Sequence, residues 1–192
     1  MLLSLPKMSF LRWMKAELST QATTIRIKES VESYLQKLLT IDAKVWNAKP
    51  ANAGWSFTQM YDHLLSAHYG MFARMIKGCA SQAYGDDGGE MNEHGEKIFA
   101  FNSLPPIEIK VPEGFNAKQP EVLDQLVAKE RLEKLLVELD GLKNVVDGAT
   151  NSYKIKHPLL GPLNAQQWYN MCDMHWRHHF RQLHKLEKEF LD

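Results

Sequence analysis

The sequence predicts an all-α protein: a single domain, residues 1–192, folded as a four-helix bundle with a long crossover between its second and third helices. Three observations support this prediction. Four stretches place apolar residues at the three-and-four spacing of an amphipathic helix. Strand-like alternation is scarce outside "IEIKV" at 107–111. The 192 residues suit one domain and are enough to bury a sizeable core.

The first predicted helix runs from about Thr23 to Asp42, before the proline and glycine of "NAKPANAG" break the pattern. The second begins within "GWSFTQM", where Gln59 follows Ser56 by three residues, the spacing of a capping box. This helix is expected to end near residues 77–78, a lysine and a glycine. Its apolar stripe consists of Met60, Leu64, Ala67, Met71 and Met75.

Residues 78–118 form the crossover, which is too long to be structureless inside a compact domain. A short helix is expected within it near residues 90–101, and "GDDGG" at 85–89 is expected to be an exposed turn. A connection of this length can span the bundle lengthwise, so the third helix need not run antiparallel to the second. The N-terminal residues 1–20 are an appendage, either a short docking segment or the result of an alternative start at Met8.

The third predicted helix follows Pro120 and ends at about Leu139, because Asp140 and Gly141 come next. The fourth begins after "HPLLGPL", where Asn164 and the glutamine three residues later repeat the capping spacing. It continues to the C-terminus.

The composition excludes several classes of protein. Lysine plus arginine equals aspartate plus glutamate at 23 each, which argues against a nucleic-acid binder. Two cysteines cannot form a disulfide framework and suit a reducing interior. No apolar run approaches the roughly 20 residues of a membrane span. A cytoplasmic protein is therefore expected.

The stretch "DMHWRHHFRQLHK" at 173–185 holds four of the eight histidines. On a helical wheel His175 and His179 lie within the buried stripe, and His178 lies on its flank. Three residues point outward: Arg177, Arg181 and His184. Two imidazoles at i and i+4 can bind one metal ion, as in the helix of zinc proteases. The protease glutamate is missing here, which argues against a peptidase. Spacing alone leaves a metal pair and a hydrogen-bonded core pair equally open.

A third ligand would come from His63, His68, His94 or His157. His63 flanks the stripe of the second helix, and the wheel prefers it only weakly over His68. His94 falls in the crossover, and His157 precedes a proline where it could simply fix the turn before the last helix. Cys172 is one turn from His175, so it is either an additional group near the metal or a small core residue.

Three motifs together resemble the DinB/YfiT-like superfamily: "WSFTQMYDHL" at 55–64, "HPLLGPLNAQQW" at 157–168 and "HWRHHFRQL" at 175–183. The resemblance implies a four-helix bundle with an up-down-down-up arrangement. It also implies a divalent metal ion, usually zinc or nickel, held by His63, His175 and His179. Gln182 matches the glutamine that follows the histidine pair. The first 20 residues and the proline-rich part of the crossover fit no motif.

The superfamily comprises metal-dependent hydrolases and thiol S-transferases that use low-molecular-weight thiols, and dimers are common in it. The resemblance therefore implies an enzyme with a small-molecule substrate, and a homodimer. Three neutral imidazoles leave an open position on the metal, where a thiol or a water could be activated. Gln182 would orient His179 or bind substrate, or it is a hydrogen-bonded core amide. The alternative is a non-catalytic bundle that binds a ligand or partner and has structural or vestigial histidines.

Overall fold

The computed structural model describes residues 18–107 and 119–191. The predictions for the N-terminal appendage up to residue 17, and for "IEIKV" beyond residue 107, lie outside these ranges. The helices are α2 (Thr20–Leu38), α3 (Ala43–Trp46), α4 (Phe57–Ala67), the π-helix η1 (His68–Ala73), α5 (Arg74–Ala80), α6 (Glu93–Phe101), α7 (Gln125–Gly148) and α8 (Ala165–Phe190). The strands are β1 (Asp86–Asp87), β2 (Tyr153–His157) and β3 (Gly161–Leu163).

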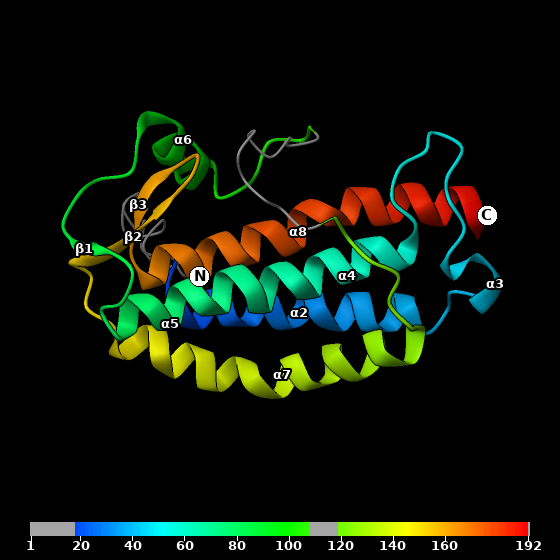
Figure 1. Ribbon diagram of the computed structural model, residues 1–192, viewed down its shortest axis with the longest axis horizontal. Helices are drawn as coiled ribbons and strands as arrows, with labels where there is room; N and C mark the ends of the chain where they lie inside the picture. The colour runs from blue at the N-terminus through cyan, green and yellow to red at the C-terminus, as the bar shows by residue number, and fades with distance from the viewer. Residues whose placement is uncertain (1–17, 108–118, 192) are drawn as a thin grey trace, which may run out of the picture.

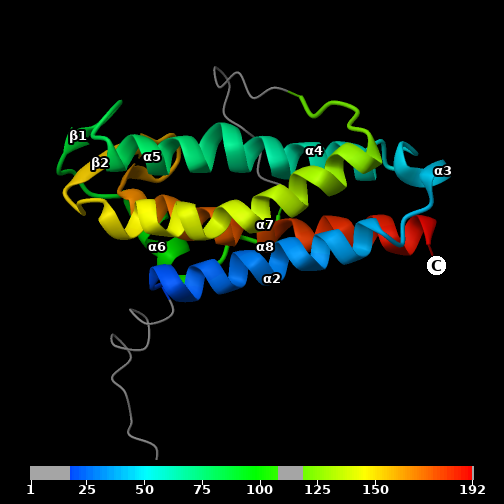
Figure 2. The same cartoon turned by 90° about the horizontal axis from the view of Figure 1, so that it is seen from below.

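Four long rods lie side by side: α2, the continuous segment α4–η1–α5, α7 and α8 (Figures 1 and 2). In Figure 1, α2 and α8 run from left to right, and the other two rods run from right to left. α5 therefore ends at the opposite end of the molecule from the start of α7. The predominantly helical fold is confirmed.

The ends of two helices differ from the prediction. The first helix stops at Leu38, and Asp42 instead caps the separate short helix α3, because its Oδ1 accepts from the amide of Lys44 at 2.8 Å. The third helix starts later, after the N-cap Asp124, and passes through Gly141 to Gly148. Two further buried residues on its stripe, Leu142 and Val146, explain this extension. Their burial outweighs the cost of about 1 kcal/mol for a glycine inside a helix.

The second rod contains a π-helix that the sequence pattern did not reveal. In the predicted stripe Met71 and Met75 would be buried, but both are half-buried, and Phe72 and Ile76 are completely buried instead. A π-helical turn contains one more residue than an α-helical turn, so every later side chain is displaced around the axis. One row of buried residues on this rod consequently has a spacing of four: Leu64, His68, Phe72 and Ile76.

A small antiparallel sheet, in the order β1-β2-β3, lies beside α6 at the end of the rods where α5 stops and α8 begins (Figure 1). The β2–β3 hairpin occupies the segment expected to be a loop, and "YKIKH" alternates buried and less buried residues along β2. The "GDDGG" segment is largely exposed, as expected, but Asp86 and Asp87 form the edge strand β1 where a turn was predicted. Helix α6 confirms the short helix predicted within the crossover.

Buried polar contacts fix how α8 lies along α2. The Thr23 hydroxyl donates to Asn170 Oδ1 at 2.7 Å, and the Arg26 guanidinium contacts the carboxylate of Asp173 at 2.8 Å. Asp173 is completely buried. Because each buried polar group needs its own partner, a shift of α8 by one turn would leave several of them unsatisfied. Among the described helices, none is both long enough and apolar enough to cross a membrane.

Candidate metal centre

Three histidine side chains from two rods meet in one place. His63 comes from α4, and His175 and His179 come from consecutive turns of α8. The Nε2 atom of His175 lies 3.1 Å from Nε2 of His63 and 3.3 Å from Nε2 of His179. One ligand atom from each of the three residues lies within 4.8 Å of the others. The structure thus brings together the three residues that the motifs indicated.

Local sequence signals set the start of both helices. Ser56 is the N-cap of α4, and its amide donates to the side-chain oxygen of Gln59 at 3.4 Å. Asn164 is the N-cap of α8, and its Oδ1 accepts from the amide of Gln167 at 2.9 Å. Both caps were predicted from the sequence, and both are confirmed. With the first residues fixed, the helical repeat determines which later side chains face the interior.

The donor set fits a divalent transition-metal ion. Nitrogen ligands of zinc lie about 2.0–2.1 Å from the metal, so tetrahedral geometry places two of them about 3.3 Å apart. The observed separations of 3.1 and 3.3 Å match this value. Without an ion, two neutral imidazoles at this distance can share only one proton, and their lone pairs otherwise face each other. The three histidines could therefore hold a metal ion.

The Nδ1 atom of His179 has a hydrogen-bond partner on the same helix. His179 Nδ1 lies 3.0 Å from Oε1 of Gln182, which can only accept, so Nδ1 carries the proton and Nε2 keeps its lone pair. Such a contact fixes the ring orientation and the tautomer that binds a metal. His175 differs, because its buried Nδ1 has no hydrogen-bond partner among the described residues.

Two aromatic residues enclose the histidines. The Trp55 ring lies 4.8 Å from the ring of His63 and is nearly parallel to that of His179 at 6.5 Å. The Phe72 ring lies 5.2 Å from that of His175. Phe72 reaches this position because the π-helix turns it inward. Sequence reasoning assigned neither residue a role, although Trp55 begins the first of the three motifs.

Burial keeps all three imidazoles neutral. It lowers the pKa of His63 to about 4 and the pKa of His179 to about 3. The pKa of His175 falls well below its usual range, first because of burial and then because of the two neighbouring histidines. At neutral pH each ring therefore offers a lone pair, and no proton has to be displaced before a metal binds.

The other candidate ligands lie elsewhere. His68 is buried in the π-helix, with Nδ1 3.4 Å from Sγ of Cys172. Burial raises the pKa of this thiol, so Cys172 is a neutral core residue. His157 ends β2, where its Nδ1 accepts from the amide of Leu159 at 3.2 Å and so fixes the turn. His94 is exposed on α6.

Contacts join the described segments before and after residues 108–118 to α8 and α4. On α8, Arg177 donates to the carbonyl of Asn102 at 2.9 Å, and Arg181 donates to the carbonyl of Pro105 at 3.3 Å. On α4, the carboxylate of Asp62, next to His63, accepts from the amide of Glu121 at 2.9 Å. Of the two arginines expected to point outward, Arg181 is exposed, but Arg177 is half-buried because it pairs with Asp173.

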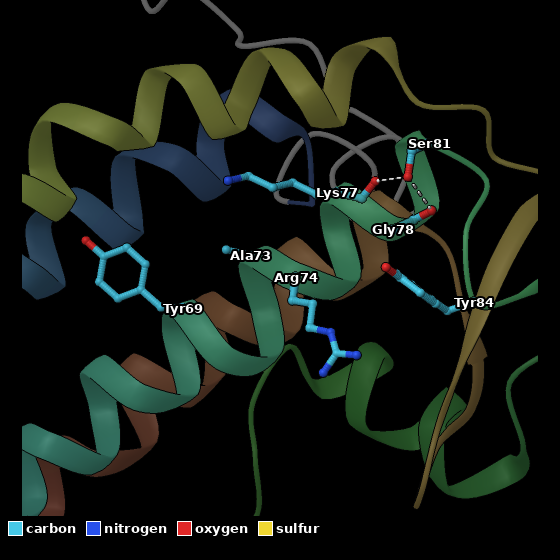
Figure 3. A pocket seen from close by; sticks show the side chains of 7 residues that line it. All are labelled: Tyr69, Ala73, Arg74, Lys77, Gly78, Ser81 and Tyr84. Carbon is cyan, nitrogen blue, oxygen red and sulfur yellow. Dashed lines mark hydrogen bonds between the residues drawn. The ribbon is translucent and has the colours of Figure 1, made fainter.

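Neither of two pockets lined by described residues contains the triad. A pocket of about 60 Å³ is lined in part by Trp55 and Gln182, but it is too small for a substrate. An open pocket of about 350 Å³ on η1 and α5 is shown in Figure 3. There the side chains of Arg74 and Lys77 extend in different directions and do not converge on one position for a ligand.

Comparison with protein families gives a match to the DinB superfamily over residues 27–183. The matched region starts in α2 and ends in α8, so it includes all three histidines. No curated protein and no solved structure matches the chain. The resemblance inferred from the three motifs is confirmed. With most of its length matched, this chain belongs to the DinB superfamily.

Proposed function

We propose that this protein is a metal-dependent enzyme that transfers a low-molecular-weight thiol to an electrophile or hydrolyses a small substrate. The observation that carries the proposal is the convergence of His63, His175 and His179, with their Nε2 atoms 3.1 and 3.3 Å apart, in a half-buried position between two rods. Zinc or nickel suits a set of three imidazoles. Three protein ligands leave room for a substrate atom, as in catalytic rather than structural sites.

A bound divalent ion would make a thiol or a water molecule acidic enough to act as a nucleophile at neutral pH. The chain supplies the neutral nitrogen ligands, and Gln182 holds the ring of His179 in its ligating tautomer. Trp55 and Phe72 limit the access of bulk water to the imidazoles. In thiol transfer the sulfur forms a bond to the electrophilic carbon, the leaving group departs with its bonding electrons, and the thiol proton passes to solvent.

The composition of the cluster favours thiol transfer over hydrolysis. Among the described residues, the group that could hold a metal consists of histidines alone, with no carboxylate in it. Hydrolysis usually needs a general base beside the water, whereas a metal-activated thiolate needs none. We further propose that the protein acts in the cytoplasm, where low-molecular-weight thiols stay reduced, and that it forms a homodimer.

Elemental analysis of the purified protein tests the proposal. One equivalent of a divalent transition metal is expected in the wild type, and a loss to near zero is expected in His179→Ala. His184→Ala is the matched control, because His184 is exposed on the same helix and should leave the metal content unchanged. Full metal occupancy in His179→Ala would refute the site.

Chelation distinguishes this proposal from a non-catalytic bundle with structural or vestigial histidines. A metal that binds only the folded state stabilises it by about 2.7 kcal/mol at a free concentration one hundred times its Kd. For a chain of this size, removing the metal should lower Tm by roughly 5–10 °C. An unchanged Tm after chelation would favour the non-catalytic alternative.

A further inference from the structure

The open pocket on η1 and α5 offers a second place for a ligand, separate from the three histidines (Figure 3). Its volume of about 350 Å³ falls within the usual range for small-molecule sites. The most buried of its lining residues are small, Ala73 and Gly78, whereas Arg74 and Lys77 are exposed. The pocket thus combines a small apolar base with two positively charged side chains.

These two cations have no acidic partner within the fold. Neither Arg74 nor Lys77 lies within 4.0 Å of a carboxylate in the part of the chain that the structure describes, and no hydrogen bond there uses a side-chain donor of either residue. Glu138, which accepts from the hydroxyl of the lining residue Tyr69 at 3.0 Å, is itself paired with Lys134 at 3.6 Å. Both positive charges are therefore left for an anionic ligand.

The two cations occupy separate positions. In Figure 3 the side chain of Lys77 extends to the left, on the side of Tyr69, whereas that of Arg74 extends downward. The Arg74 guanidinium lies over the ring of Tyr84, with Cζ 5.6 Å from the ring centroid, and this cation–π contact holds it there. Two acidic groups on one molecule match this arrangement better than a single small anion does.

The ring of Tyr84 is placed beside Arg74 at a cost to the backbone. Its φ is 70°, a left-handed conformation that is strained for a bulky side chain. The side chain is 74% exposed, so its burial offsets little of this strain. Residues strained in this way cluster at ligand sites. Stability alone does not account for an exposed tyrosine where the backbone favours glycine, and a ligand does.

Gly78 allows the Tyr84 ring to approach the helix closely. A Cβ at this position would lie 3.2 Å from Cδ2 of Tyr84 and 2.8 Å from Cδ1 of Ile155. The next residue after the tyrosine is also fixed, because the amide of Gly85 donates to the hydroxyl of Tyr153 at 2.9 Å and that hydroxyl donates to the Gly85 carbonyl at 2.7 Å. The ring therefore forms a fixed wall of the pocket.

We propose that this pocket binds a small molecule with two separated carboxylate groups, one held by Arg74 and the other by Lys77. A guanidinium donates two parallel N–H groups to a planar carboxylate, and an ammonium binds the second carboxylate as a compact charge. Ala73 and Gly78 give the chain between the two groups a small apolar surface. The inference does not depend on the proposed metal, because the pocket does not contain the triad.

A length series of dicarboxylates tests this site. Succinate, glutarate, adipate and pimelate are each titrated into labelled protein at low salt, next to the monocarboxylate of the same chain length, and the amide NMR signals of residues 69–84 are followed. For at least one length the diacid should bind about fivefold more tightly than the monoacid, because a second exposed ion pair contributes up to this factor. Higher ionic strength should reduce the difference.

Variants separate the two contacts from general charge effects. Arg74→Met and Lys77→Met should each reduce the preference to less than about twofold, since each removes one of the two ion pairs. Lys188→Met is the matched control, because it removes an exposed charge near the C-terminal end of α8, at the other end of the molecule (Figure 1), and it should keep the full preference. Tyr84→Gly should weaken binding of the best diacid by about twofold or more. Its stability in urea should stay close to that of the wild type, because glycine adopts a positive φ readily.

Several results would overturn the site. No preference for a diacid of any length, or a full preference in either methionine variant, would exclude the two-point contact. A preference that disappears after the metal is removed with phenanthroline would place the diacid at the histidines instead. Unchanged affinity in Tyr84→Gly would show that the ring is no part of the site.

Discussion

His63 and His175 are 112 residues apart in the sequence, yet their Nε2 atoms lie 3.1 Å from each other. Neither residue can reach this position through its own helix alone. The contact requires α4 and α8 to lie side by side in one register. The caps set where each of these helices begins, and buried polar contacts set the position of α8 along α2. The metal-binding geometry is therefore a property of how the rods pack.

The indole of Trp55 should report metal binding directly. Its ring lies 4.8 Å from that of His63 and 6.5 Å from that of His179, so a paramagnetic ion at the triad lies close enough to quench its fluorescence. One equivalent of Ni²⁺ should lower the tryptophan emission of the wild type, and Trp55→Phe should lose the largest part of this decrease.

Trp168→Phe is the control for the Trp55 experiment. Trp168 lies on α8 seven residues before His175, about 10 Å away along the helix axis. This variant should show a decrease similar to that of the wild type. Equal quenching in Trp55→Phe and the wild type would mean that the ion binds at another position.

Gln182 should raise the affinity for the metal through His179. Its Oε1 accepts from His179 Nδ1 at 3.0 Å, and loss of such a contact typically weakens metal binding by about 10- to 100-fold. Competition with a chromogenic chelator should show this loss for Gln182→Leu. Gln182→Glu keeps an acceptor and should retain the affinity. Gln21→Leu, which changes an exposed glutamine on α2, should have no effect. If Gln182→Leu binds the metal with wild-type affinity, Gln182 is only a hydrogen-bonded core amide.

The buried His157 should make the free energy of unfolding depend on pH. Burial lowers its pKa from 6.5 to about 4, so the folded state resists protonation while the unfolded state accepts a proton. The stability that the neutral His157 provides is complete above pH 6.5 and is lost as the pH falls toward 4. Between pH 7 and pH 5 this residue should account for about 2 kcal/mol of lost stability.

The measurement for His157 is urea unfolding of chelated protein at several pH values. His157→Asn cannot titrate, so its stability should fall less steeply than that of the wild type over this range. His94→Asn, at an exposed position on α6, should follow the wild-type curve. Parallel curves for His157→Asn and the wild type would show that the pKa of His157 is not lowered.

The sequence alone was sufficient for the helical fold and for identifying the histidine pair on α8, because both depend on local patterns. Capping boxes at Ser56 and Asn164 and the i, i+4 pair on α8 are signals contained within one helix. His63 could be separated from His68 only weakly on the wheel, since an ideal helix takes no account of the π-helix that begins at His68. Similarity to known motifs, rather than geometry, made that choice.

Features that depend on tertiary contacts could not be predicted. The third helix continues past Gly141 because Leu142 and Val146 are buried against other rods, which no local propensity reveals. Asp173 belongs to a stretch rich in charged and polar residues, yet it is completely buried. Trp55 approaches the histidines from a loop, which has no periodic signal.

Asp173 should be one of the most sensitive positions for stability. Its buried carboxylate pairs with Arg26 at 2.8 Å and with Arg177 at 2.9 Å, and Arg177 also holds Asn102 of the crossover. Removing one partner of a buried ion pair costs about 3–5 kcal/mol, because the remaining charges lose their partner where water cannot replace it. Asp173→Ala should therefore lower the free energy of unfolding by about this amount in urea denaturation.

Asp140→Ala gives the matched comparison, because Asp140 pairs with Lys28 at 2.7 Å but its side chain is 68% exposed. Exposed pairs contribute about 0–1 kcal/mol, so this variant should stay close to the wild type. If Asp173→Ala is too unstable to purify, Asp173→Asn preserves the shape and part of the hydrogen bonding, and its loss of stability should still exceed that of Asp140→Ala. Similar small losses of stability in all three variants would mean that the network around Asp173 does not hold α8 in place. Other contacts would then have to set the register that brings His175 to His63.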